Sequence, residues 1–477
     1  MKPRIVIVGA GIAGLTAAYR ADRLARERGL DVEVVLLEGS SRAGGVIESV
    51  EEEGCLLELG PDSIITEKPW ARALAEEIGL KDRIIGTSNE HRQSFVALGN
   101  KLHPIPEGFY MMAPTRLSTF AASRLFSLPG KARMAMDLVL PRRTDASDES
   151  LASFVTRRLG REALDRAAQP MVGGIYTADP ARLSLRATMP RFVEMERRHR
   201  SLILGLSAAM KRSAAAPGST AGPRYSLFIS FDKGLSVLPS RLCELLPQGC
   251  VRTGVMVESV ERREDGRWIV HTLDTAQERI EADAVCLATP AYASARILES
   301  ASPELARSLN GIEYASTAIV NLLYRRADIA HPLHGFGFVV PAVERRTLLA
   351  CTFSSVKYAG RAPEGMVLIR GFVGGALFPE HFEMPDERML AGIDRDLAEL
   401  LGVRARPRHA RIVRWPRSMP QYNVGHLERV ARIEDEAGRL PAFALAGAAL
   451  HGVGIPDCVR SGEAAAERLV LALARGR

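Results

Sequence analysis

The chain has 477 residues, 47% hydrophobic and 25% charged, which is an ordinary globular composition with room for about two to four domains. Its formal net charge is +7, but no Lys/Arg run is interleaved with aromatic residues, which argues against a nucleic-acid partner. The six cysteines form no C-x-x-C pair, so we expect no metal site and a cytoplasmic protein. No apolar stretch reaches the roughly 18 residues of a membrane span, so any membrane contact is expected to be peripheral.

The first forty-five residues carry the most specific pattern. An apolar run, Ile5 to Val8, ends in the turn GAGIAG, and a second apolar run ends at Glu38. In a strand–turn–helix unit the first glycine permits the turn, the second admits a pyrophosphate, and the third lets helix and strand pack. The carboxylate of Glu38 can accept hydrogen bonds from both hydroxyls of a ribose. We therefore expect a dinucleotide bound by Gly9, Ala10, Gly11, Ile12, Ala13, Gly14 and Glu38.

Residues 69–215 have apolar positions at helical spacing, so we expect a mostly helical segment. Pro69 is expected to start a helix, and a Pro-Gly pair at Pro129 to interrupt the amphipathic stretch 115–140. We expect the apolar side chains of that stretch to pack between helices rather than to form a membrane-contact face or the mouth of a pocket. Pro170 is expected to break a later helix, and the small polar residues 213–222 to form a loop.

The second half of the chain returns to strands. Val285 to Ala288 should join the cofactor sheet, and Pro290 should start a helix. A last apolar strand then precedes a long terminal helix. The predicted fold class is α/β, with residues 1–68, 226–300 and 415–477 forming a discontinuous, Rossmann-like dinucleotide-binding domain. Residues 69–215 form a helical inserted domain and residues 301–414 a strand-rich, mixed-sheet substrate domain.

Three further motifs resemble those of the flavin-dependent amine oxidase and porphyrinogen oxidase superfamily. They are SRAGG at residues 41–45, ELGPDS at residues 58–63, which resembles the turn under the isoalloxazine ring, and GVGIPDC at residues 452–458. The last would lie at a helix N-terminus beside the flavin. The resemblance implies FAD rather than NAD. It assigns further cofactor contacts to Arg42, Gly44, Gly45, Gly60, Pro61, Asp62, Ser63, Val257, Trp415, Gly454, Ile455 and Asp457.

Longer stretches, among them FSLPGKARMAMD, GGIYTADPARLSL and MPQYNVGHLERV, resemble the porphyrinogen oxidases of bacterial haem synthesis. The resemblance implies removal of six electrons from a porphyrinogen by the flavin, with dioxygen as acceptor and no catalytic side chain required. Coproporphyrinogen III is favoured over protoporphyrinogen IX, and neighbouring haem-synthesis enzymes are candidate partners. Ile64 departs from the usual Phe after GPDS.

Substrate contacts are expected at Lys68, Gly174, Tyr176, Phe336 and Phe338. Each has a structural alternative: a solvated charge for the lysine, a helix break for the glycine, and plain core for the rings. His426 and His451 could accept protons, but satisfied interior or surface histidines are the favoured interpretation. Two other functions stay open. One is an FAD amine oxidase, for which Cys458 would be the candidate for covalent attachment, and the other is a non-catalytic flavoprotein.

Overall fold

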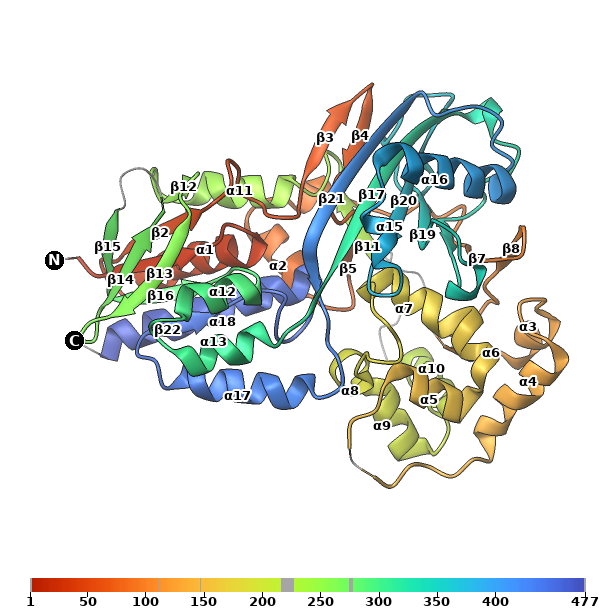
Figure 1. Cartoon of the computed structure of the whole chain (residues 1–477), viewed down its shortest axis with the longest axis horizontal. Coiled ribbons are helices and arrows are strands. Elements are labelled where there is room, and N and C mark those ends of the chain that lie inside the picture. The colour runs from red at the N-terminus through yellow and green to blue at the C-terminus, as the bar shows by residue number, and fades with distance from the viewer. Residues whose placement is uncertain (1, 111, 146, 216–226, 274–277, 476–477) are drawn as a thin grey trace.

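The computed structural model describes residues 2–110, 112–145, 147–215, 227–273 and 278–475. Most of the expected loop 213–222 lies outside these residues. Figure 1 shows three parts: a sheet with helices on both faces, a second sheet with long strands β17 and β21, and a block of helices α3 to α10. The predicted α/β class is confirmed, whereas the domain boundaries stay predictions.

The first sheet is wholly parallel, in the order β12-β2-β1-β16-β22. Its strands are continuous apolar runs, as expected for a sheet covered on both faces. Ile5 and Ile7 pack with helices α1 and α18, whereas Val6 and Val8 face the opposite core. The strands are β1 (Arg4–Val8), β2 (Glu33–Glu38), β12 (Val251–Thr253), β16 (Ala284–Leu287) and β22 (Phe443–Leu445).

Helices and a small antiparallel sheet cover the two faces of this parallel sheet. Helices α1 (Ile12–Glu27) and α18 (Ile455–Arg475) pack against each other on one face. Val8 pairs with Leu37 and stands level with Leu287, so the carboxyl ends of the strands share one edge. That edge is where α1 begins. The opposite face carries α12 (Ala291–Leu298), α13 (Pro303–Asn310), α17 (His426–Gly438), β13 (Val257–Arg262), β14 (Trp268–Thr272) and β15 (Arg279–Ala282).

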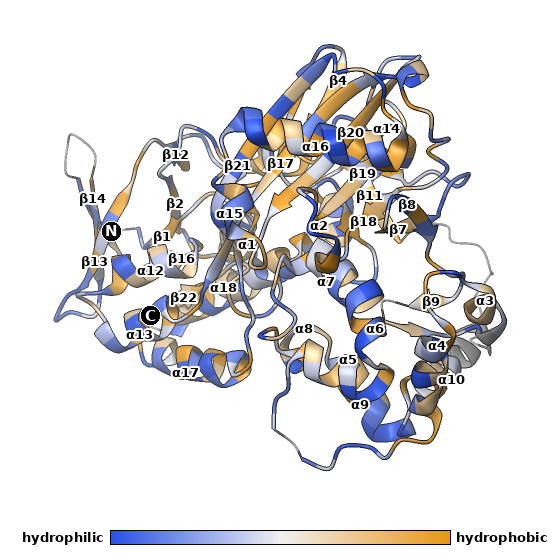
Figure 2. Cartoon of the chain, turned by 45° about the vertical axis from the view of Figure 1, so that its right-hand side comes forward, coloured by the Kyte–Doolittle hydropathy of each residue, from blue (hydrophilic) through white to orange (hydrophobic). Residues whose placement is uncertain are grey.

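The second sheet is mixed, in the order β21-β17-β20-β19-β18-β7-β8. Every pair is antiparallel except β18 with β7. Figure 2 shows α16 (Asp386–Leu401) lying over the largely hydrophobic strands β17 and β20. The strands are β21 (His409–Pro420), β17 (Tyr314–Arg325), β20 (Met366–Gly374), β19 (Ala350–Phe353), β18 (Gly337–Val339), β7 (Ser94–Leu98) and β8 (Lys101–Pro104).

Short elements connect the two sheets. Strand β4 leads into the segment that contains residues 58–63, and Leu57 and Leu59 pack against Leu323 and Leu368 of the mixed sheet. The remaining short elements are β3 (Ser49–Glu52), β4 (Cys55–Glu58), β5 (Ile64–Ile65), α2 (Trp70–Glu77), β6 (Ile84–Gly86), β11 (Phe228–Phe231), α11 (Val237–Leu245), and α14 (Ser354–Lys357) and α15 (Pro379–Phe382) beside the mixed sheet.

The helical block differs from the prediction in three respects. Strands β6, β7 and β8 occupy part of the segment that we expected to be helical. Pro129 lies in the first turn of α4, where its missing N–H costs nothing, and Ser127 caps that turn. The helix does not break at Pro170. A π-helical turn, Leu164–Ala168, runs directly into α7, which tolerates the proline in its first turn.

The block comprises α3 (Leu117–Ala122), α4 (Leu128–Ala135), α5 (Leu151–Leu159), α6 (Arg161–Ala163), α7 (Gln169–Tyr176), α8 (Leu185–Thr188), α9 (Pro190–His199) and α10 (Leu202–Ala215). Phe120, Phe126 and Met134 are buried in its core, whereas Leu128 is 80% and Val139 69% exposed. The stretch 115–140 therefore packs on one side and presents apolar side chains on the other. Over the described ranges, no helix combines the length and apolarity needed to cross a membrane.

A fully buried ion pair holds the helical block together. Asp137 accepts hydrogen bonds from Arg158 Nε at 2.8 Å, Ser201 Oγ at 2.6 Å and the Ile203 amide at 3.0 Å. Both charged side chains are 0% exposed. The pair thus joins α5 to the segment before α10.

Replacing Asp137 with Ala should lower the free energy of unfolding by about 3–5 kcal/mol, because the buried charge of Arg158 would keep only the more distant Glu196, at 3.6 Å, as its counter-charge. Chemical denaturation followed by circular dichroism measures the change. Asp145→Ala is the control, since that carboxylate is 59% exposed in the same block. Equal, small effects of both variants would contradict the structural importance of the pair.

Candidate active site

The glycine turn leaves one face of the backbone open. Gly9 has φ +98, and a Cβ at Gly14 would overlap the carbonyl oxygen of Gly9. At Gly11, by contrast, a Cβ would meet nothing within 4 Å. No side chain caps the start of α1. Free N–H groups and an open backbone at a helix N-terminus fit a phosphate group, as the sequence predicts.

The carboxylate of Glu38 lies across from this turn, at the end of β2. One oxygen accepts the Ala10 N–H at 2.7 Å and the other accepts the Ser40 N–H at 2.8 Å. The Glu38 carbonyl pairs with the N–H of Val255, so Val257, which is 3% exposed, follows close to the same strand end. Glu38 and Val257 are therefore together at the end of the turn where a nucleoside would lie.

Residues 44–47 lie between the glycine turn and residue 60. The Gly44 N–H donates to the Ala10 carbonyl at 2.8 Å, and a Cβ at Gly60 would overlap the carbonyl oxygen of Val46. Arg42 is turned onto its own loop, with its guanidinium on the Gly45 carbonyl at 2.6 Å and on Glu48 at 2.7 Å. Its predicted contact with the cofactor stays a prediction.

Three strands of the mixed sheet bind three consecutive carbonyl groups of the segment before Pro61. Asn321 Nδ2 on β17 donates to the Glu58 carbonyl at 3.2 Å, and Trp415 Nε1 on β21 to the Leu59 carbonyl at 2.7 Å. Arg370 on β20 donates to the Gly60 carbonyl. Within the described part of the chain, the buried atoms Asn321 Oδ1 and Arg370 Nε have no hydrogen-bond partner. These two atoms on the sheet can therefore still form hydrogen bonds with a bound polar group.

Asp62 is surrounded by groups that sequence analysis did not identify. Lys357 Nζ lies 3.0 Å from Asp62 Oδ2 and 2.7 Å from Ser63 Oγ, and Arg370 lies 3.5 Å from Asp62. Burial raises the pKa of Asp62, but Lys357 and Arg370 outweigh it and hold that pKa well below its usual range. Arg370 could have been found from the sequence, because a charged residue inside the apolar run LIRGFV is unusual for a buried strand. No sequence pattern marks Lys357.

Lys68 and Asp457 form an ion pair at the start of α18. Lys68 Nζ lies 2.7 Å from both carboxylate oxygens, and the side chains are 45% and 11% exposed respectively. Burial, and then Asp457, raise the pKa of Tyr176 to about 12. The structure therefore pairs Lys68 with Asp457, whose carboxylate also acts on Tyr176, and places Gly454 and Ile455 just before Asp457 in the chain.

The other predicted substrate contacts are distributed differently. Gly174 is exposed on α7, and a Cβ there would meet only Val339 at 3.7 Å. Phe338 is 2% exposed and packs edge-on against Phe353, which matches the core alternative. Phe336 is half-buried and its backbone pairs with Gln93 and Phe353.

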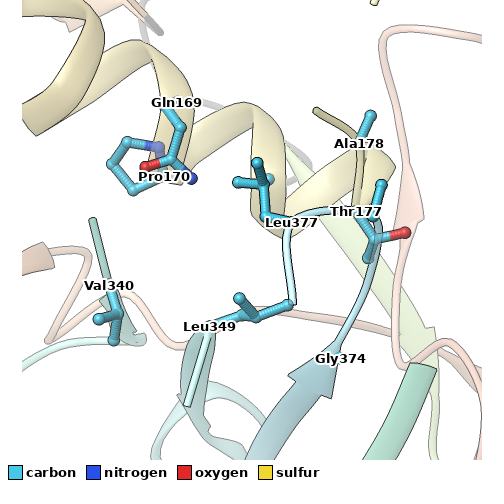
Figure 3. A pocket seen from close by; sticks show the side chains of 10 residues that line it. Gln169, Pro170, Thr177, Ala178, Val340, Leu349, Gly374 and Leu377 are labelled. Atoms are coloured by element: carbon cyan, nitrogen blue, oxygen red, sulfur yellow. The ribbon is translucent and has the colours of Figure 1, made fainter. Parts of the chain in front are cut away.

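Two hollows lie where the helical block meets the mixed sheet. In Figure 3, Gln169 and Pro170 of α7 lie opposite Val340 and Leu349 of the mixed-sheet side. The space that these residues help to line has a volume of about 10 Å³, room for about one water. A larger hollow of about 230 Å³ is lined in part by Asp179, Arg182 and Glu313. Arg182 and Glu313 are 2.5 Å apart, so that positive charge is already paired.

Both candidate histidines have structural partners. His426 is 0% exposed, stacks on Tyr422 at 3.9 Å and bonds through Nε2 to the Leu450 carbonyl at 3.0 Å. His451 is exposed and lies 2.6 Å from Glu434. These contacts favour the structural interpretation over proton transfer.

Acid should destabilise the protein partly through His426. Burial lowers the pKa of His426, with Arg429 and His451 adding to the shift and the Leu450 carbonyl and Asp148 opposing it. The unfolded chain therefore binds a proton more readily, and the free energy of unfolding falls as the pH drops through the ordinary histidine range. His426→Gln should reduce the difference in unfolding free energy between about pH 7.5 and about pH 5.5. His451→Gln is the control. If only this variant reduced the pH-dependent difference in unfolding free energy, the assignment of that difference to His426 would be wrong.

Comparison with known proteins places the chain in a family. A model described as flavin containing amine oxidoreductase matches residues 12–470. Coproporphyrinogen III oxidase of Bacillus subtilis (strain 168) is 34% identical, over 97% of this chain and 97% of its own. Coproporphyrinogen III oxidase of Propionibacterium freudenreichii subsp. freudenreichii is 36% identical, over 98% and 90% respectively. A solved structure from Exiguobacterium sp. 255-15, provisionally named a protoporphyrinogen oxidase, matches with a TM-score of 0.86 at 31% identity, covering 99% of each chain. The chain therefore belongs to the flavin containing amine oxidoreductase family.

Proposed function

We propose that this flavin-dependent oxidase converts coproporphyrinogen III to coproporphyrin III, with FAD as its cofactor and dioxygen as its electron acceptor. The observation that carries the proposal is the similarity to two coproporphyrinogen III oxidases over nearly the whole chain. The turn at Gly9 to Gly14 and the carboxylate of Glu38 support a dinucleotide form of the flavin.

The flavin is proposed to be held without a covalent bond. Cys458 is the cysteine nearest to the start of α18, and it is 8% exposed. Burial, and then Asp457, raise the pKa of its thiol to about 12, against a smaller opposing effect of Lys68. A thiol that stays protonated at neutral pH is a poor nucleophile. This argues against the covalent attachment that an amine oxidase could use.

The proposed reaction removes six electrons and six protons from the porphyrinogen, and three molecules of dioxygen accept them to give three molecules of hydrogen peroxide. The flavin, when bound, supplies the electron transfer. The protein residues bind and orient the macrocycle and exclude water. Lys68, Gly174 and Tyr176 are the first proposed substrate contacts. Phe336, which is half-buried, is a weaker candidate, and Phe338, which lies in the core, is the weakest.

Protoporphyrinogen IX is the second candidate substrate. Asp457 already neutralises Lys68, which weakens the argument that this lysine selects the substrate with four carboxylates. The name of the similar solved structure also favours this candidate. Neighbouring haem-synthesis enzymes as partners, peripheral membrane contact and a cytoplasmic location remain predictions.

Purified protein should be yellow and should release about one FAD per chain on acid denaturation. Glu38→Ala should weaken FAD binding by roughly 1.5–3 kcal/mol, the value of one hydrogen bond to a charged group. Titration of apoprotein with FAD measures the affinity. Glu33→Ala is the control, because Glu33 lies at the opposite end of β2 and pairs with Arg4. Equal FAD affinity in both variants would remove Glu38 from the proposed site.

Substrate choice is tested by following porphyrin fluorescence with each porphyrinogen at matched concentration. Faster turnover of coproporphyrinogen III is expected, and faster turnover of protoporphyrinogen IX would overturn the preference. If Lys68 contributes to selection, Lys68→Ala should raise the Michaelis constant for coproporphyrinogen III a few-fold at low salt, because a half-exposed pair is worth only about 0.2–1 kcal/mol. Lys81→Ala is the control. Equal changes for both substrates would leave Lys68 with a role in positioning Asp457.

A further inference from the structure

Lys357 and Arg370 form, with Asp62, a largely buried cluster that carries more positive than negative charge. The side chain of Lys357 is 12% exposed, that of Arg370 3% and that of Asp62 17%. Glu58, 3.7 Å from Arg361, is the other carboxylate that acts on Arg370. Among the described residues, these three cations thus face two carboxylates. Burial raises the pKa of Glu58 and lowers that of Arg370, so both charges carry a cost of burial.

Hydrogen bonds and ion pairs tie the cluster to residues 60–63. Lys357 contacts both Asp62 and Ser63, and the Tyr358 hydroxyl donates to Ser63 Oγ at 2.9 Å. Arg370 contacts the Gly60 carbonyl and Asp62. Helix α14 and strand β20, which lie about 300 residues further along the chain, therefore hold residues 60–63 in place.

The same segment crosses between the two helix N-termini of the first sheet. Gly60 touches Val46 beside the glycine turn, and Lys68, eight residues further on, binds Asp457 in the first turn of α18. Between them Ile64 is 0% exposed, in one hydrophobic cluster with Ile12 of α1 and Ile455 of α18. A flavin that extends from the glycine turn along this edge would meet residues 60–63, and the charged cluster would lie directly behind them.

We infer that Lys357 and Arg370 are positioning residues that set the electrostatic potential behind residues 60–63, and so stabilise the negative charge that the flavin gains on reduction. The inference rests on the flavin binding proposed above, but it does not depend on which porphyrinogen is oxidised. Preorganised charge in a buried site acts strongly because the surroundings screen it poorly. Asp62 then has two effects: it holds the two cations in place and cancels part of their charge.

Opposite charge changes at one cluster provide the test. Lys357→Met removes a positive charge and should lower the flavin midpoint potential, whereas Asp62→Asn removes a negative charge and should raise it. For one unit charge at a distance on the order of 10 Å and an effective dielectric constant of about 20, each change should alter the ratio of reduced to oxidised flavin at a fixed potential roughly tenfold. The measurement is spectroscopic reduction of the holoprotein beside a reference dye.

Three further variants separate charge from structure. Lys357→Arg keeps the charge and should keep the potential, and the double variant Lys357→Met with Asp62→Asn should return close to the unmodified value. Lys101→Met, at an exposed position on β8, is the control. Shifts of both single variants in the same direction, or no shift in either, would overturn the inference. If Lys357→Met fails to hold flavin, Asp62→Asn and Lys357→Arg still decide the question.

The outcomes also distinguish the inference from the proposed function. A purified protein without any flavin would contradict the proposed function itself. A flavoprotein that oxidises neither porphyrinogen, yet shows the opposite shifts in potential, would contradict the proposed substrate and support the charged cluster. A protein that oxidises coproporphyrinogen III, but whose two variants keep an unshifted potential, would support the proposed substrate and contradict the role of the charged cluster.

Discussion

The structure depends on the docking of one short chain segment onto the face of the mixed sheet. Asn321, Trp415 and Arg370 donate to the carbonyl groups of Glu58, Leu59 and Gly60, which are consecutive in sequence. A buried carbonyl without a donor is costly, so a sheet that offers three donors selects one position for the segment. The two sheets are thereby held in a fixed relation, and residues 60–68 are directed along the edge of the parallel sheet.

The two ends of the segment 60–68 differ in charge and exposure. At residue 62 two cations meet one carboxylate in a buried environment, whereas at residue 68 one lysine meets one carboxylate and is half exposed. The buried end can act on a bound group through its field, and the exposed end is suited to contacts that form and break. The uncapped start of α1 adds a third source of positive potential near the glycine turn.

Local patterns in the sequence predicted the parallel sheet well, because its strands are continuous apolar runs next to glycines and caps that act over a few residues. The glycine turn at residues 9–14, Glu38 and the start of α18 could be located for the same reason. Strand β7 could not, because its partner β18 lies more than two hundred residues away and stabilises it only in the folded protein. Strand β8 pairs in turn with β7, so it depends on the same long-range contact. Lys357 was missed on similar grounds: its partners, Asp62 and Ser63, become neighbours only through tertiary structure. The π-helical turn before Pro170 likewise depends on geometry that no residue type signals.

The pairing of α1 with α18 constrains the order in which the chain can mature. Residues 12–27 bury an apolar face against residues 455–475, and β22, near the end of the chain, completes the parallel sheet. During synthesis, helix α1 must therefore wait until residues 455–475 have been made before it can pack against α18. Long-range contacts of this kind slow folding and leave apolar surface exposed for longer. The parallel sheet can therefore become complete only after residue 445 has been made.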